Sequence, residues 1–249
     1  MIKYYTKILN EVIYLNKIQC ESCKTKLCAS KVPIFASLNR DHLSKVVSKI
    51  NHLSFNKGEA ICVEGDPSSS LVIINQGQVK LTKVTKEGKE QIIRVLAPGD
   101  FFGELSIFNE KDKYNFSAYA LSSVKICSLS KEAMHTILIE NPEISVKILT
   151  EVSKRLMEAE NLAQNLATND ADIRVASLIS EFGEKYGHNT DLGIEVNLPM
   201  NREDMANYIG VTRETISRKL TKLQDSGVIS LVGNKTLIIK DSSKLEDFM

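Results

Sequence analysis

Three cysteines, Cys20, Cys23 and Cys28, stand close together near the start of the chain. A thiolate is a soft ligand and a nucleophile, so clustered thiols suit metal binding, iron–sulfur ligation or reversible oxidation. Charged and amide side chains interrupt every apolar stretch of the N-terminus, which is unlike a signal peptide, so we expect a cytoplasmic protein. In such a reducing compartment, clustered thiols are more often ligands or sensors than structural bridges.

A second group near the other end has the residue types that read DNA bases. On a helix beginning at about Thr212, the side chains of Arg213, Glu214, Ser217 and Arg218 fall near its N-terminal end. Glu214 and Arg218 are four residues apart and therefore share a face. Arginine can donate two hydrogen bonds to guanine, and glutamate can accept one from cytosine. This spacing is typical of a helix that lies in the major groove.

Two lysines follow on the same helix, Lys219 and Lys222, and we expect them to meet phosphates, which position a protein on DNA without specifying sequence. The net charge of the whole chain is only +1, so any DNA-binding surface must be local. Basic residues do outnumber acidic ones between 199 and 240. The alternative is a solvated helix carrying an ordinary Glu–Arg pair, but the elements around it favour DNA binding.

Those elements predict a winged helix. A short helix from about Asn201 is stopped at Gly210, and the second helix begins at Thr212, which is the helix-turn-helix layout. Two strand-like runs then flank Gly233 and Asn234, a pair of residues that favours a hairpin turn. A further helix is predicted between 170 and 186, with a strand at about 194–198.

The preceding part of the chain has a different pattern of residues. Between 55 and 130, short apolar runs are separated by Gly, Pro, Asn and Asp, with no helical pattern among them. Several short strands at regular intervals predict an antiparallel sandwich or barrel. Ser130 is a suitable N-cap for a following helix, and Pro142 occupies a first-turn position in the next one, which we expect to extend to about Leu166.

A narrow apolar stripe runs along that last helix in alternating steps of three and four residues, the spacing of a coiled-coil seam. The stripe could pack on the core of its own domain, but its narrowness and its charged flanks favour the interface of a parallel homodimer. Glu158 and Glu160 lie beside it and would repel their mates, which would keep the dimer weak. The stripe consists of Leu149, Val152, Leu156, Ala159, Ala163 and Leu166.

The composition fits a soluble globular protein, with 43% hydrophobic and 25% charged residues in 249. No apolar run approaches the roughly 18 residues that would span a membrane, so we expect no membrane partner. Nothing in the sequence resembles a nucleophile–base pair or a phosphate-binding loop, so we do not expect an enzyme.

From about residue 35 onwards the chain resembles the Crp/Fnr superfamily of transcription regulators. The resemblance rests on Gly58-Glu59, Glu64-Gly65-Asp66, Gly77, Val79-Lys80-Leu81 and the segment from Ala97 to Leu105, followed in order by the seam helix and the winged helix. It implies an α+β fold with an N-terminal antiparallel β-roll of the cyclic-nucleotide-binding, jelly-roll type, a long dimerisation helix and a C-terminal winged helix-turn-helix. The corresponding domains are 1–34 for the cysteine segment, 35–140, 141–168 and 169–249.

The cysteines resemble those of the oxygen-sensing Fnr branch, in which an N-terminal cluster and one β-roll cysteine hold a 4Fe–4S cluster. The resemblance makes Cys127 the fourth ligand beside Cys20, Cys23 and Cys28. Four residues separate Cys23 from Cys28, one fewer than in that branch. A zinc site and a disulfide switch remain open, since zinc also accepts four thiolates and a switch needs only two. We expect no such role for Cys62 or for the scattered histidines, His42, His52, His135 and His188.

The Crp branch holds cyclic AMP through a Gly-Glu pair and an Arg-Ser pair. Gly103 and Glu104 match the first pair, but Phe116 and Ser117 stand at the second, without the arginine. An uncompensated phosphate is costly in a buried pocket, so we do not expect cyclic AMP as a cofactor. A different small molecule in the β-roll is the rival to a cluster.

The expected function is therefore an oxygen- or redox-responsive, homodimeric regulator that binds double-stranded DNA and contacts RNA polymerase. Glu214, Ser217 and Arg218 resemble the Fnr branch, whereas Arg213 stands where the Crp branch has an arginine that reads an additional guanine. The resemblance thus implies a palindrome with a TGA core, and it favours TGTGA-N6-TCACA over TTGA-N6-TCAA.

Overall fold

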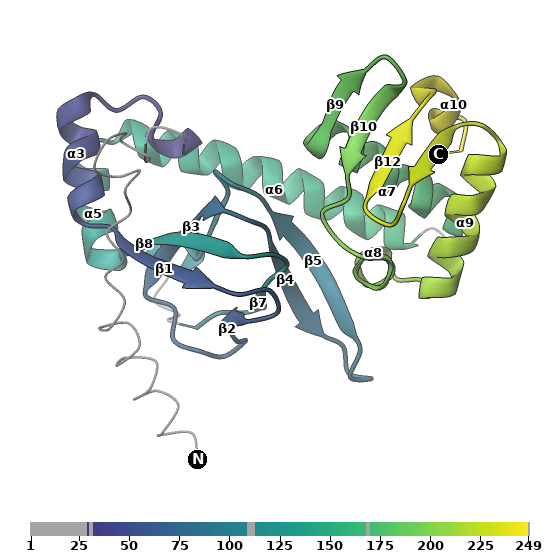
Figure 1. Cartoon of the computed structure of the whole chain (residues 1–249). Coiled ribbons are helices and arrows are strands. Elements are labelled where there is room, and N and C mark those ends of the chain that lie inside the picture. The colour runs from purple at the N-terminus through teal and green to yellow at the C-terminus, as the bar shows by residue number, and fades with distance from the viewer. Residues whose placement is uncertain (1–28, 30–31, 109–112, 168–169, 249) are drawn as a thin grey trace. The chain divides into compact units, whose positions relative to one another are not determined.

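The structure is a computed structural model that describes Ala29 and residues 32–108, 113–167 and 170–248 (Figure 1). The chain divides into two compact units. One comprises the described residues up to Lys83 with Arg94–Ser153, and the other comprises Val84–Ile93 with the described residues from Lys154 onwards. Helix α6 (Glu143–Ala167) contributes to both units. The domain boundaries given above stay predictions.

Two four-stranded sheets form the β-roll, so the predicted fold class is confirmed. Their strand orders are β1-β8-β3-β6 and β2-β7-β4-β5, and β8 pairs antiparallel with both β1 and β3. The strands are β1 (Asn51–Phe55), β2 (Ala60–Cys62), β3 (Ser70–Gln76), β4 (Val79–Val84), β5 (Glu90–Leu96), β6 (Phe101–Phe102), β7 (Ser117–Ala120) and β8 (Val124–Ser130).

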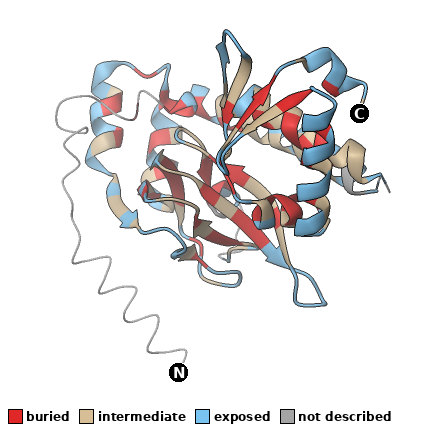
Figure 2. Ribbon diagram, turned by 45° about the vertical axis from the view of Figure 1, so that its right-hand side comes forward, coloured by how far each residue is buried: buried red, intermediate tan, exposed pale blue. Residues whose placement is uncertain are grey.

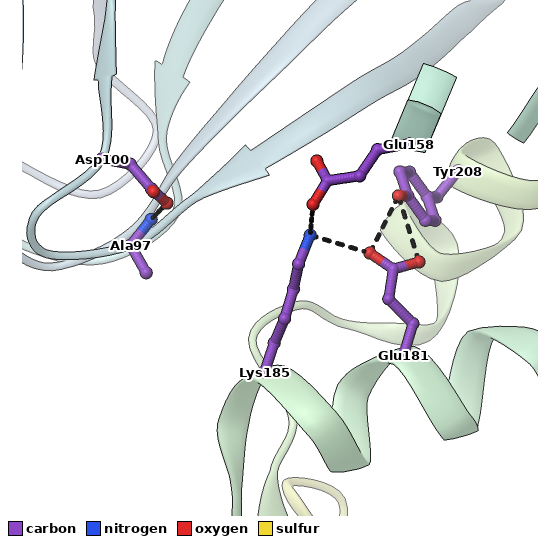
Figure 3. Close-up of polar contacts among 6 residues, drawn as sticks. All are labelled: Ala97, Asp100, Glu158, Glu181, Lys185 and Tyr208. Atoms are coloured by element: carbon purple, nitrogen blue, oxygen red, sulfur yellow. Dashed lines mark hydrogen bonds and ion pairs between the residues drawn. The ribbon is translucent and has the colours of Figure 1, made fainter. Parts of the chain in front are cut away.

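The turn between β5 and β6 is closed by a side chain of the Crp/Fnr-like segment. The Oδ2 of Asp100 accepts a hydrogen bond of 2.8 Å from the backbone N–H of Ala97 (Figure 3). The short helix α4 (Glu104–Phe108) follows β6. Gly103, just before it, has φ +85°, and a Cβ there would collide with the carbonyl of Ser70, so the position requires glycine.

A hydrophobic cluster, which we call the roll core, lies in the first unit, and Figure 2 marks the buried residues of the chain in red. It draws on the 3-10 turn η2 (Pro33–Phe35), α3 (Arg40–Ser48), the strands β3 and β8, α5 (Lys131–Glu140) and the first turns of α6. Ser130 caps α5 as predicted, because its side chain accepts a hydrogen bond of 3.2 Å from the N–H of Ala133. The roll core therefore connects the strands of the sensor domain to the helix that carries the predicted seam.

The second unit contains the predicted winged helix-turn-helix. Its sheet has the order β11-β12-β10-β9, and the hairpin of β11 and β12 turns at Gly233 as expected. Strand β9 was not predicted, because its residues read as the end of a helix. The elements are α7 (Ala171–Tyr186), β9 (Gly187–Thr190), β10 (Gly193–Asn197), α8 (Arg202–Ile209), α9 (Arg213–Asp225), β11 (Ile229–Val232), β12 (Thr236–Ile239) and α10 (Ser242–Glu246).

Among the described residues, no helix combines the length and the apolar character that crossing a bilayer requires.

Candidate functional site

The turn between α8 and α9 is fixed by caps and by one arginine. Gly210 ends α8 in the left-handed conformation, with φ +66°, and Thr212 caps α9 by accepting a hydrogen bond of 3.2 Å from the N–H of Thr215. The Nη1 of Arg174 on α7 donates to the carbonyls of Ile209 and Gly210 at 2.9 and 3.2 Å. Sequence reasoning missed Arg174, which holds the turn from another helix and had no local signal.

Helix α9 presents the predicted base-reading residues to solvent. Its buried side is formed by Ile216, Leu220 and Leu223. Arg213, Glu214, Ser217 and Arg218 are all exposed. Because residues three and four apart share a helix face, the structure brings these four together along one side of the first two turns.

Thr221 is a further exposed residue on that side, one turn beyond Ser217 and Arg218. Its hydroxyl donates a hydrogen bond of 3.1 Å to the carbonyl of Ser217. The sequence reasoning overlooked Thr221, although its spacing of three and four residues from those two side chains was a sufficient signal.

The two lysines of α9 are paired with a carboxylate of the same chain, and their contact with phosphates stays a prediction. The Nζ atoms of Lys219 and Lys222 lie 2.7 and 3.1 Å from the same Oδ2 atom of Asp172. Asp172 is in the first turn of α7. Both lysine charges are thus already partnered within the chain.

A polar cluster ties α8 to α7 and to the second half of α6 (Figure 3). The hydroxyl of Tyr208 donates to the carboxylate of Glu181 at 3.1 Å, and the Nζ of Lys185 lies 3.3 Å from Glu181 and 3.4 Å from Glu158. Burial, reinforced by the charge of Glu181, raises the pKa of Tyr208, so the phenol stays protonated. Glu158, which lies beside the predicted dimer seam, forms this ion pair within its own chain, and its repulsion of its mate stays a prediction.

The predicted seam of α6 is largely uncovered. Leu149 and Leu156 are 64% and 61% exposed, large values for leucine, and Ala159 and Ala163 are also exposed. Val152 differs, because it packs partly against the roll core. Leu166 lies in α6, but its side chain is outside the described residues. Exposed Val146, Ser153 and Met157 belong to the same side of the helix by their spacing.

Cys127 is the one predicted cluster ligand that the structure describes; Cys20, Cys23 and Cys28 lie outside the described residues. Cys127 is buried in β8, and its Sγ lies 3.5 Å from the Nδ1 of His52 on β1. The Nδ2 of Asn75 on β3 donates to the same sulfur at 3.8 Å. Sequence reasoning did not single out His52, because only the β1–β8 register places it opposite Cys127.

Cys62 lies elsewhere, on β2, where burial raises the pKa of its thiol to about 12. A thiol in that state is unreactive at neutral pH. Within the described ranges no three side chains of His, Cys, Asp or Glu are grouped as metal ligands.

The β-roll has aromatic side chains where the Crp-like phosphate site would lie. The ring of Phe116 packs against Phe102 and Tyr114, with centroid separations of 5.8 and 5.7 Å. Burial is the main cause that raises the pKa of Tyr114, so this hydroxyl is neutral. The three rings offer an apolar surface and no cation to a phosphate.

Comparisons with known proteins agree with this architecture. The model of the cyclic nucleotide-binding domain matches residues 52–141, and that of the Crp-like helix-turn-helix domain matches residues 173–248. FixK2 from Bradyrhizobium japonicum has a similar structure, with a TM-score of 0.72 at 23% identity over 80% of this chain and 96% of its own. A β-roll, a long helix and a winged helix in this order define a DNA-binding regulator of transcription.

Two relatives extend over most of the chain. The electron transport regulator A of Shewanella oneidensis is 30% identical over 230 residues, which is 92% of this chain and 89% of the relative. The CRP-like cAMP-activated global transcriptional regulator of Mycobacterium tuberculosis is 28% identical over 216 residues, 87% of this chain and 96% of the relative. The chain belongs to the Crp/Fnr family of transcription regulators. Its relatives are DNA-binding regulators rather than enzymes, and regulators of this family are dimers.

Proposed function

We propose that DNA binding by this regulator is controlled by oxygen or redox state through a 4Fe–4S cluster held by Cys20, Cys23, Cys28 and Cys127. The observation that carries the proposal is the extent of the roll core. It includes Ala29, the residue next to Cys28, together with Cys127 and Ile148 of α6. Cys127 and the residue that follows Cys28 in the sequence are thus packed into the same buried cluster as the helix that carries the seam.

The four cysteines are suitable ligands for a 4Fe–4S cluster. Four cysteine thiolates are the usual ligands of a 4Fe–4S cluster, and the cluster when bound supplies a reaction with oxygen or an electron change. His52 and Asn75 lie beside the sulfur of Cys127, and groups at hydrogen-bonding distance from ligand sulfur tune such centres. The remaining three thiols come from a segment that the sequence places directly before the roll core.

A path from Cys127 to the dimer seam follows the chain itself. Strand β8 leads through the cap Ser130 into α5, and α5 leads into α6. The roll core packs Leu129, Met134, Ile137, Ile144 and Ile148 along this route. A close-packed core transmits a displacement rather than absorbing it, so a change at Cys127 would alter how α6 presents its exposed stripe.

The test is an ultraviolet–visible spectrum with iron and sulfide assays on protein purified without oxygen. We expect a broad brown absorbance with about four irons per chain, bleaching in air. Cys127→Ala should lose the colour, whereas Cys62→Ala, the matched control on β2, should keep it. Colourless wild-type protein would reject the cluster and leave a thiol switch, and stoichiometric zinc without iron would leave a structural zinc site.

We further propose the DNA site and the partners. The paired stripe of α6 would hold two α9 helices about one turn of DNA apart, on a palindrome that resembles TGTGA-N6-TCACA more than TTGA-N6-TCAA. The exposed guanidinium of Arg213 supports the additional guanine. As a transcription regulator, the dimer would act on RNA polymerase at the promoter.

A ligand in the β-roll is the second candidate, favoured by the match to the cyclic nucleotide-binding domain and by the cAMP-activated relative. The aromatic packing of Phe116 argues against a cyclic nucleotide, because an apolar ring leaves the phosphate charge without a partner. We expect no heat of binding on calorimetric titration with cyclic AMP and no change in DNA affinity. Saturable binding that raises DNA affinity would move control to the β-roll.

A further inference from the structure

Two lysines of the DNA-reading helix share one carboxylate on another helix. The Nζ of Lys219 lies 2.7 Å, and that of Lys222 3.1 Å, from the Oδ2 of Asp172. The side chains of Lys219 and Asp172 are only 19% and 23% exposed, whereas that of Lys222 is 54% exposed. The Lys219–Asp172 pair is therefore mostly buried, and Lys222 contacts the same carboxylate from its more exposed side.

The contact is reinforced on both sides. Asp172 stands in the first turn of α7, where the exposed N–H groups of the helix favour a negative charge. The Nζ of Lys222 also lies 5.7 Å from the ring centroid of Phe248, which follows α10, and a cation over an aromatic face is attracted to it. Three elements of the second unit, α7, α9 and the end of the chain, thus meet at these two ammonium groups.

The carboxylate is charged under ordinary conditions. Burial by itself would raise the pKa of Asp172, but hydrogen bonds from Lys219 and Lys222, and the charges of both, outweigh it and lower the pKa. An ionised carboxylate at hydrogen-bonding distance offers a lysine what a DNA phosphate offers, a negative oxygen that accepts a charge-assisted hydrogen bond.

The geometry points to Asp172 as a specificity-determining residue of DNA binding, which holds Lys219 and Lys222 as an internal counter-ion and withholds both from the phosphate backbone. Lysine–phosphate contacts strengthen binding to every sequence alike, whereas base contacts discriminate. With the two lysines partnered in the chain, the exposed surface of α9 is dominated by its base-reading side chains. Discrimination between a specific palindrome and random DNA is then larger than the basic residues of α9 would otherwise allow.

Lys219 is also held on the inner side of the helix. It lies three residues after Ile216 and four before Leu223, both of which are buried. Without the charge of Asp172, its long flexible stem can carry the ammonium outwards to solvent or to a phosphate. The side chain of Lys222 is already 54% exposed at the edge of this contact, so a smaller movement brings its ammonium group to solvent or to a phosphate.

The experiment uses the full-length protein with a specific palindrome and a random duplex of equal length, and follows each dissociation constant against salt. Asp172→Asn keeps the shape of the side chain and removes its charge. If both lysines of each protomer contact a further phosphate, the dimer gains four, and the loss of random-duplex affinity between about 50 and 200 mM salt becomes about a hundredfold larger. The ratio of specific to random affinity falls at the same time.

Three controls decide the cause. Asp225→Asn removes the same charge from the exposed end of α9, and we expect the wild-type salt slope. The triple variant Asp172→Asn/Lys219→Met/Lys222→Met should return to that slope as well, because the released cations are gone. Lys219→Met/Lys222→Met alone should leave it unchanged.

Three outcomes would overturn the proposal. An Asp172→Asn slope equal to wild type would show that the carboxylate withholds nothing. A steeper slope shared by Asp225→Asn would reduce the effect to general charge. A shallower slope in Lys219→Met/Lys222→Met would show that the two lysines already contact phosphates in the wild-type complex.

Discussion

Cys127 on β8 and Ile148 on α6 are buried in the same hydrophobic cluster. One is the only proposed cluster ligand among the described residues, and the other lies in the dimerisation helix one residue before the exposed Leu149. Because the roll core is continuous between them, the proposed sensor and the proposed dimer seam share a packed interior rather than a flexible linker.

Loosening the roll core should weaken the coupling between the proposed cluster and dimerisation. We expect Ile148→Val to lower the free energy of unfolding by about 0.5–1.5 kcal/mol. It should also reduce the difference in dimer dissociation constant between anaerobic and air-exposed protein, measured by analytical ultracentrifugation. Ile229→Val removes the same methyl group from a buried site in the second unit and should leave that difference intact. Equal effects of the two substitutions would argue against a path through the roll core.

The exposed stripe of α6 can be tested directly. Leu156→Asn places an amide in the proposed seam, where its burial in a dimer would be costly, and we expect the dimer to weaken. Ile139→Asn is the matched control, because Ile139 is 80% exposed on α5 and outside the stripe. If Ile139→Asn dissociates the dimer and Leu156→Asn does not, the interface lies elsewhere.

The half-site preference should depend on Arg213. Arg213→Ala should lose about 1–3 kcal/mol of binding free energy on the TGTGA palindrome, from the lost guanine contact. It should lose much less on the TTGA palindrome. Arg218→Ala is expected to weaken binding to both, since the TGA core is common to them. A uniform loss with Arg213→Ala, seen by fluorescence anisotropy on both duplexes, would make Arg213 a phosphate contact.

The stability supplied by Asp172 should depend on pH. Its pKa is lowered in the folded protein, so the stabilisation is present above the ordinary carboxyl pKa and is lost as pH falls through the folded value. Asp172→Asn should therefore have a lower free energy of unfolding than wild type at pH 7, measured by urea denaturation. The difference should be about 1 kcal/mol or less, because the pair is partly exposed. The difference should shrink below about pH 4. A difference independent of pH would mean that the charge contributes nothing.

The thiol of Cys62 should not react with alkylating reagents in the native protein. Burial raises the pKa of its thiol to about 12, so almost no thiolate exists at pH 8. We expect iodoacetamide to leave the Cys62 peptide unmodified at pH 8 and to modify it fully in urea, as read by mass spectrometry. Rapid native alkylation would place Cys62 among the candidates for a thiol switch.

Local signals in the sequence were enough for most of the fold. The cap at Ser130, the stop at Gly210 and the turn at Gly233 each depend on a few neighbouring residues, and the structure has all three. The exposed face of α9 followed from helical spacing alone. Strand β9 was missed because it forms by pairing with β10, and Gly187 and Asn189 are residue types that strands disfavour.

Pairings between distant residues account for what the sequence reasoning missed at the site. His52 meets Cys127 through strand register, and Asp172 meets Lys219 through the packing of α7 on α9. The type of a lysine on a DNA-reading helix suggests a phosphate contact. The position of Lys219 between the buried Ile216 and Leu223 explains why it meets Asp172, a pairing that the sequence reasoning missed. The phosphate contact of these lysines stays a prediction.

The central claim is that oxygen controls DNA binding through the cluster. It is tested most directly by measuring the DNA affinity of one anaerobic sample before and after exposure to air. The protein would be titrated onto a labelled TGTGA palindrome without oxygen, exposed to air and titrated again, with its absorbance recorded alongside. The account predicts tight binding by a brown dimer and much weaker binding once the colour is lost, with Cys127→Ala weak throughout. Equal affinity before and after bleaching, or tight binding by colourless Cys127→Ala, would contradict it.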